Sequence, residues 1–347
     1  MNKSIIVAIL GLIAGLLLIG LGFLLVRGDF TKFNGRNAAS RYEKDEYRCS
    51  GKIDEIEIGE RSENIEIRIG SVDKPVIEYW YREGEKDEIV ITEKDGKLTF
   101  KREDKHSMKV VFFSMNFEDT STVVTLPEDY NGPITATATS GRVMATGITT
   151  GKDMTLKANS GYVVAENLKA DNLTMKATSG SIKLNDTECA GRAEIENTSG
   201  YITVERLATG GEVFLKNTSG YIRATDVSCG NISAQNSSGG MGLTKIACDE
   251  LFARSTSGSI KLTNVSSKSI EAENTSGGIR LDDVAGDALK FVSRSGSING
   301  NINGKESDYS VITSTTSGSC NLAASRDGEK TLDVSTTSGG IRISFDK

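Results

Sequence analysis

Apolar and polar residues alternate along much of the chain, and from about residue 134 the alternation recurs in short blocks. In a typical block Leu173 and Met175 precede a Ser-Gly pair, and Ile182 and Leu184 follow it. A period of two predicts β-strands that bury one face. A further apolar residue, such as Leu207, stands seven positions after the glycine in most blocks. Each block is therefore expected to form two or three short strands.

The Ser-Gly pair recurs every 19 to 22 residues. Its glycines are Gly141, Gly161, Gly180, Gly200, Gly220, Gly239, Gly258, Gly277, Gly296, Gly318 and Gly339. Such a period indicates a repeat architecture, in which each unit buries its apolar face against its neighbours. We predict an all-β, single-chain parallel β-solenoid with coils of about 20 residues. Each glycine is expected to form a structural turn, with the preceding Thr198, Thr218 or Ser237 hydrogen-bonding across it.

The N-terminal residues 4–26 carry no charge and lie between Lys3 and Arg27. An α-helix of this length, at about 1.5 Å per residue, can cross a bilayer. A cleaved signal peptide is the alternative, but it usually has a shorter apolar core and ends in small residues. We therefore predict a short segment at 1–3, then a single transmembrane signal anchor at 4–26. The C-terminal domain is expected to be extracytoplasmic.

Between the anchor and the repeats we predict a juxtamembrane linker at 27–50 and a β-rich cap module at 51–133. The cap strands alternate, as in Ile56 and Ile58, and Asp95-Gly96 is a hairpin signal. This module is placed to cover the first coil of a solenoid at 134–347. At the other end, the final strand at 341–347 is expected to form an edge of the stack protected mainly by charge.

The composition argues against several classes of function. The formal net charge of −6 is unlike that of a nucleic-acid binder. Five cysteines do not make a disulfide scaffold, and no cluster of Cys and His suggests a zinc site. The single histidine, His106, stands in a charged stretch that is most simply a solvated loop. We predict no catalytic residue, no metal and no cofactor.

Two columns of residues beside the Ser-Gly corner form a candidate ligand surface. The first directly follows the glycine and the second lies three positions after it. Exposed aromatic rings can stack on sugars, and a basic column can attract an anionic wall polymer. The simpler alternatives are cross-strand stacking and an ordinary solvated face. The residues are Tyr162, Tyr201 and Tyr221 in the first column and Lys183, Arg223, Lys261 and Arg280 in the second.

Cys229 and Cys248 both lie nine residues after their glycines, in neighbouring repeats. In stacked coils their Cα atoms would be about 5 Å apart, inside the range that a disulfide bridges. The sequence leaves open whether they form this bridge or remain free thiols.

Three aspartates leave a carbohydrate-active enzyme as an alternative function, because parallel β-helix polysaccharide lyases carry carboxylates on an outer sheet. Asp226, Asp282 and Asp283 stand five or six residues after their glycines. The connections between strands are short, however, whereas a catalytic cleft usually needs loop insertions.

The apolar N-terminal run, the strand Val123–Pro127 and coils such as Thr198-Ser199-Gly200-Tyr201-Ile202 carry a resemblance. From about residue 50 the chain resembles the bacterial putative-adhesin family of β-strand-repeat proteins, which includes LiaG-like envelope proteins. The resemblance implies a β-solenoid in the cell envelope and supplies no catalytic residue.

The expected function is that of a membrane-anchored, extracytoplasmic binding or scaffold protein, related to envelope stress and acting without catalysis. Its expected partners are the membrane and a cell-wall polymer, glycan or envelope protein, and not nucleic acid. The alternatives are a carbohydrate-active enzyme on a β-helix and a bactofilin-like scaffold that polymerises end to end.

Overall fold

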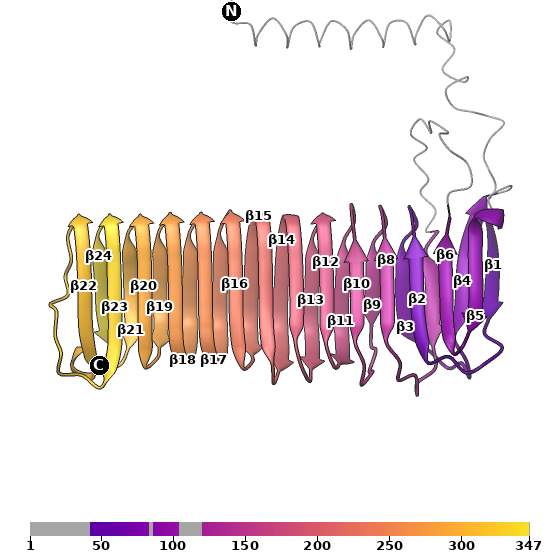
Figure 1. Cartoon of the computed structure of the whole chain (residues 1–347), viewed down its shortest axis with the longest axis horizontal. Helices are drawn as coiled ribbons and strands as arrows, with labels where there is room; N and C mark the ends of the chain where they lie inside the picture. Colours follow the sequence, from indigo (N-terminus) through magenta and orange to yellow (C-terminus); the bar gives the residue numbers. More distant parts are fainter. Residues whose placement is uncertain (1–41, 83–85, 104–119, 347) are drawn as a thin grey trace, which may run out of the picture. The chain divides into compact units, whose positions relative to one another are not determined.

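The structure, a computed structural model, describes residues 42–82, 86–103 and 120–346. The described residues fall into two compact units, the first of which holds 44–80, 87–103 and 120–346. The first unit contains an all-β parallel solenoid of about ten turns, which confirms the fold class predicted from the repeat. Its strands lie side by side along the stack in Figure 1, with the indigo and purple strands at one end and the yellow strands at the other.

The predicted membrane anchor at 4–26 lies outside the described residues. Within the described ranges, no helix is long and apolar enough to span a membrane. The helical elements found there are the short 3-10 turns η2 (Lys86–Glu88) and η3 (Glu306–Asp308).

A first parallel ladder consists of the strands that lie before the corner of each coil. Leu156 lies between Ala136 and Met175 of the neighbouring coils, and all three are fully buried. The alternation seen in the sequence thus becomes one continuous apolar face inside the stack. The strands are β2 (Glu55–Glu60), β6 (Lys97–Arg102), β8 (Ile134–Ala138), β10 (Met154–Ala158), β12 (Leu173–Ser179), β16 (Asn231–Ser238), β20 (Ala288–Ser295), β22 (Tyr309–Ser317) and β23 (Lys330–Ser338).

A second parallel ladder follows the corner, and in it Ile202 lies between Ile182 and Ile222. Its strands are β3 (Ile65–Ile69), β7 (Thr122–Leu126), β9 (Val143–Thr146), β11 (Val163–Ala170), β13 (Ile182–Cys189), β19 (Ile279–Ala285), β21 (Ile298–Asn303) and β24 (Ile341–Asp346). Longer strands run through a corner and so contribute to both ladders. These are β14 (Ala193–Thr209), β15 (Glu212–Ser228), β17 (Met241–Ser257) and β18 (Ile260–Ser276).

A second corner, six residues after the glycine, separates the second ladder from a short third one that carries Leu207. The corner residues have φ between 48° and 59°, which is the left-handed region. Asn and Asp adopt this conformation at lower cost than most residues, and they hold most of these positions. The residues are Asn167, Asp186, Arg206, Asp226, Lys245, Asn264 and Asp283.

At the N-terminal end the coils are not stacked in chain order. β2 and β3 pair on one side with β6 and β7 and on the other with β8 and β9, all in parallel. The parallel ladders therefore continue N-terminal to residue 134. The antiparallel strands β4 (Val76–Arg82) and β5 (Ile89–Lys94) pair with β7 and β6. Asp95 and Gly96, with φ of 52° and 77°, make the predicted hairpin turn between β5 and β6. β1 (Tyr42–Arg48) precedes these strands in the chain.

At the C-terminal end the prediction that the final strand forms an edge is wrong. β24 pairs along its length with β21, and on its other side Ile341 forms a bridge with Cys320. β23 likewise lies between β20 and β22. Apolar burial gives the physical reason, because Ile341 and Ile343 are 2% and 1% exposed inside the stack. The coil outside them offers only Cys320 and Leu322 at the corresponding inward positions.

The outermost strand β22 is itself partly covered. Val311 and Ser325 exchange two backbone hydrogen bonds of 3.1 Å, so the segment after β22 folds back along its outer edge. A covered edge does not favour the end-to-end polymer, which needs unpaired backbone groups to pair with a second chain.

Candidate functional site

The corner glycines predicted from the sequence stack on one another. Gly200 has a φ of 124°, and a Cβ on it would lie 1.9 Å from the carbonyl oxygen of Gly180 in the preceding coil. Gly220 faces Gly200 in the same way, at 1.9 Å. This close approach places the residue after each glycine at the same point of every coil. The column of candidate tyrosines follows directly from it.

Buried asparagines hold these corners from inside. Asn197, Asn217, Asn236 and Asn274 stand three residues before their glycines and are 1–4% exposed. The Nδ2 of Asn217 donates to the carbonyl of Gly200, one coil back, at 2.8 Å. Thr198, Thr218 and Ser237, which the sequence predicts for this bond, are exposed instead. In the sequence, the recurrence of Asn three residues before the glycine could have indicated this role.

Two of the carboxylates in the enzyme interpretation hold backbone corners. Asp226 and Asp283 adopt the left-handed conformation at the second corner, and the carboxylate of Asp283 accepts from Asn303 Nδ2 at 3.0 Å. Asp282 points to the surface of the second ladder. His106 lies outside the described residues. In the ranges that are described, no group of three or more His, Cys, Asp or Glu residues is placed to hold a metal ion.

Of the three candidate tyrosines, the structure brings two together. Tyr201 and Tyr221 are register partners in neighbouring coils. Tyr162 is two coils from Tyr201, because Ser181 occupies the coil between them. Tyr162 and Tyr201 are 59% and 61% exposed. Tyr221 is half-buried, since its ring lies over Gly240 of the next coil.

The predicted basic column is contiguous only in part. Lys261 and Arg280 are register partners, whereas one coil separates Lys183 from Arg223 and another separates Arg223 from Lys261. Lys183 already has a carboxylate partner, Glu166, at 3.5 Å. The structure thus favours Lys261 and Arg280 as the pair available to a ligand.

Arg342 of β24 extends this pair and was not identified from the sequence. The register runs from Arg280 to Asn299 and from Asn299 to Arg342. Because β24 is inserted beside β21, Arg342 is two coils from Arg280 rather than three. The available signal was its position, three residues after Gly339, which matches the other cations.

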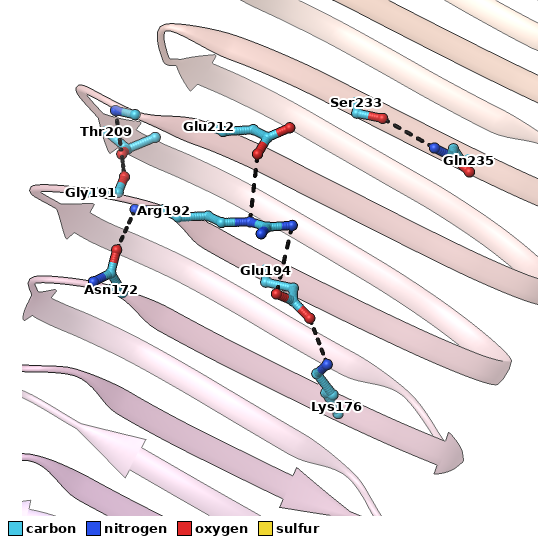
Figure 2. Close-up of polar contacts among 10 residues, drawn as sticks. Asn172, Lys176, Gly191, Arg192, Glu194, Thr209, Glu212, Ser233 and Gln235 are labelled. Atoms are coloured by element: carbon cyan, nitrogen blue, oxygen red, sulfur yellow. Dashed lines mark hydrogen bonds and ion pairs between the residues drawn. The ribbon is translucent and has the colours of Figure 1, made fainter.

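On the first ladder, in contrast, opposite charges pair across neighbouring coils. Figure 2 shows Lys176, Glu194, Arg192 and Glu212 joined in series by contacts of 2.5, 3.6 and 3.6 Å. The hydrogen bond between Lys176 and Glu194 raises the pKa of the lysine and lowers that of the carboxyl. These charges have partners within the solenoid and so need none from outside.

The second ladder carries a groove of about 1160 Å³ on its outer face. Tyr221 lies at one end of it. Its floor consists of Gly240, Ser259, Gly278 and Ser297, which occupy the tyrosine column in the following coils. The groove therefore begins where the tyrosines give way to small residues.

The cations Lys261, Arg280 and Arg342 line this groove and are exposed. Among the described residues, none of the three has a carboxylate oxygen within 4.0 Å. Asp282 and Asp346 also line the groove, so its charged side chains number three cations and two carboxylates. Asn299, Asn301 and Asn321 also line the groove. Asn301 is hydrogen-bonded to Asp346 and to the N–H of Asp283, and Asn321 to the backbone of Ile343.

Cys229 and Cys248 lie side by side as thiols, with the N–H of Cys229 donating to Ala247 of the next coil at 3.1 Å. The neighbouring side chain of Cys248, together with burial, raises the pKa of Cys229. Cys189, in the same column, faces Thr209 in the next coil and has no cysteine there. Burial raises the pKa of Cys189 to about 12.

We predict that oxidation joins Cys229 to Cys248, because neighbouring parallel strands hold Cα atoms about 4.8 Å apart, inside the disulfide range. Alkylation of denatured, non-reduced protein should then leave two of the five cysteines unmodified, as measured by intact mass. Cys248→Ser is the control and should free every remaining thiol. Full alkylation of the unsubstituted protein after oxidant treatment would contradict the bridge.

Comparison with known proteins adds the following. The family described as Toastrack DUF4097 matches residues 53–226 and 208–347. A putative adhesin from Bacteroides fragilis is 15% identical over 88% of this chain and 98% of its own, with a TM-score of 0.36. A putative lipid binding protein from Parabacteroides distasonis is 16% identical over 88% of this chain and 98% of its own, with a TM-score of 0.33. A putative cell adhesion protein from Clostridium sporogenes is 11% identical over 88% of this chain and 100% of its own, with a TM-score of 0.29. No curated protein matches the chain.

Proposed function

Because the chain belongs to the Toastrack DUF4097 family, an adhesin-like β-repeat family, we propose that it is a non-catalytic binding or scaffold protein of the bacterial cell envelope. In this proposal residues 4–26 tether it to the membrane and the solenoid lies outside the cytoplasm. Kinship with LiaG-like proteins and a role in envelope stress belong to the same proposal. The ligand is a cell-wall polymer, a glycan or an envelope protein.

The observation that carries the proposal is the outer face of the second ladder. It exposes Tyr201 and a groove whose cations Lys261, Arg280 and Arg342 lack carboxylate partners among the described residues. A protein that only needed solubility could pair these charges, as Lys176, Glu194, Arg192 and Glu212 are paired on the first ladder. Unpaired cations in a recessed surface favour a ligand from outside.

Three further features support the proposal. Asp226 and Asp283, two of the three carboxylates of the enzyme alternative, are accounted for by backbone geometry at the second corner. The uncharged run at 4–26 supports the anchor, and the antiparallel strands β4 and β5 support a cap that ends the parallel ladders.

Retention of envelope polymer tests the proposed activity. We expect the full chain, immobilised in detergent, to retain purified cell-wall polymer and to leave its chain length unchanged after prolonged incubation. Size-exclusion chromatography of the eluted polymer checks both points. Shortened polymer would support the enzyme instead, and no retention would contradict the binding function.

Protease treatment of intact cells tests the topology. An extracytoplasmic solenoid should be cleaved or released from whole cells, while a cytoplasmic marker protein stays intact. A solenoid that is degraded only after lysis would contradict the proposed orientation.

A further inference from the structure

We propose that the second-ladder groove binds one strand of a hydroxyl-rich polyanion, laid along the stack across Lys261, Arg280 and Arg342. The strand is a glycan or polyol chain that bears phosphate or carboxylate groups. This inference rests on the proposed function and adds to it the site, the direction and the chemistry of the ligand.

The spacing of the cations carries the first step. Lys261 and Arg280 are in adjacent coils, and Arg342 lies two coils further on with Asn299 between them. Parallel strands repeat about every 4.8 Å, so the three cations lie on a line about 14 Å long. An extended polymer can meet such a line with successive acid groups. Arginine guanidinium groups bind phosphate or carboxylate in charge-assisted, bidentate geometry.

The remaining side chains of the groove argue for hydroxyl groups between the acid groups. Asn299 offers both a donor and an acceptor, and Asp282 can accept from hydroxyls. Asn301, Asn321 and Asp346 already hydrogen-bond within the stack, so only their remaining donor and acceptor positions face a ligand. Two carboxylates beside three cations would repel a densely charged chain such as a nucleic acid or polyphosphate. A polymer whose anionic groups are separated by neutral hydroxyl-bearing units fits this alternation of charge.

The floor and the end wall set the shape of the site. Gly240, Ser259, Gly278 and Ser297 leave room along the column that Tyr201 and Tyr221 occupy in earlier coils. The Tyr221 ring stands at the end of the groove, with the guanidinium of Arg223 6.0 Å from its centroid. Tyr221 and Arg223 lie on β15 and the floor residues at stacked corners between strands, so little backbone entropy is lost when a ligand binds.

A steric variant and a charge variant test the site. Ser259→Tyr fills the floor without a change in charge, and Tyr201 shows that the column accepts this side chain in an otherwise similar coil. Arg280→Glu reverses the central cation. Lys157→Glu is the matched control, because Lys157 is an exposed cation on the first ladder, away from the groove. Its replacement by Glu changes the net charge by the same amount as Arg280→Glu does.

The measurement is calorimetric titration of the full chain in detergent with three oligomers of equal length. The probes are a glycerol-phosphate oligomer, an oligogalacturonate and a neutral malto-oligosaccharide. We expect at least one acidic probe to bind about tenfold or more tightly than the neutral one. That affinity should weaken as salt is added. Ser259→Tyr and Arg280→Glu should each reduce it about tenfold or more, with Lys157→Glu close to the unsubstituted protein.

The outcomes separate the site from the general function. Preference for the phosphate or the carboxylate probe identifies the acid group. Equal binding of acidic and neutral probes, or no effect of the groove variants, overturns the inference. If the protein retains envelope polymer while both groove variants bind normally, the proposed function stands and this site is wrong. Circular dichroism melts of each variant confirm that the coils remain folded.

Discussion

Gly200→Val is expected to destabilise the solenoid by about 4 kcal/mol or more, which is at the upper end for a single substitution. The φ of 124° is unfavourable for any L residue, and a Cβ would lie 1.9 Å from the carbonyl oxygen of Gly180. The obstacle is backbone, so the neighbouring coil can yield only by separating. Ser199→Ala, on the exposed side of the same corner, should cost less than about 0.5 kcal/mol. Thermal melts followed by circular dichroism compare the two, and equal losses would contradict the role of the corner.

Gly147→Ala and Gly200→Ala separate the two causes of this loss. Gly147 has a φ of 68°, but a Cβ there would meet nothing within 4 Å. Its substitution adds only the cost of a left-handed residue, about 1–2 kcal/mol. Gly200→Ala adds the backbone clash as well and should lower the melting temperature clearly further. A similar loss at both sites would mean that left-handed backbone strain alone, and not the clash with Gly180, causes the loss at Gly200.

Glu60→Gln is expected to cost about 1–3 kcal/mol, because it removes the buried negative charge that accepts hydrogen bonds from Arg102 and Thr122. Glu60 accepts from Arg102 Nε at 2.8 Å and from Thr122 at 2.5 Å, and the two charged side chains are 0% and 8% exposed. Arg102 also donates to the carbonyl of Trp80 at 2.9 Å. The pair therefore ties β2, β6 and β7 together at the N-terminal end of the stack.

Glu194→Gln is the matched control for Glu60→Gln, since Glu194 pairs with Lys176 at the surface (Figure 2). Exposed pairs contribute about 0–1 kcal/mol, so this variant should melt close to the unsubstituted protein. Replacing both partners, as Glu60→Leu with Arg102→Met, should recover much of the stability lost in Glu60→Gln. Equal effects of Glu60→Gln and Glu194→Gln would contradict a stabilising role for the buried pair of Glu60 and Arg102.

The candidate surface was predictable to the extent that it depends on position within one repeat. Tyr201, Tyr221, Lys261 and Arg280 were all identified by counting from a glycine, because the register of parallel coils preserves that count. Counting did not reveal the groove. A groove needs large residues beside small ones, and that contrast appears only when the column after the glycine is followed across many coils.

The buried asparagines illustrate a different limit. In the sequence Asn217 is a polar residue directly before a Thr-Ser-Gly corner, which predicts that it belongs to an exposed turn. In the structure it faces the core, because the carbonyl of Gly200 one coil back needs a donor there. The partner lies 17 residues away in the chain, and local sequence carries no direct record of it.

The sequence by itself determined the repeat, the inward face of each strand and the corner at each glycine, because these follow from the period of the pattern and from local backbone preference. Only the tertiary structure decided the order of the coils at the two ends. Which coil lies outermost depends on comparing the apolar burial of whole strands, such as Ile341 and Ile343 against Cys320 and Leu322. That choice moves Arg342 next to Asn299 and so completes the line of cations with Lys261 and Arg280.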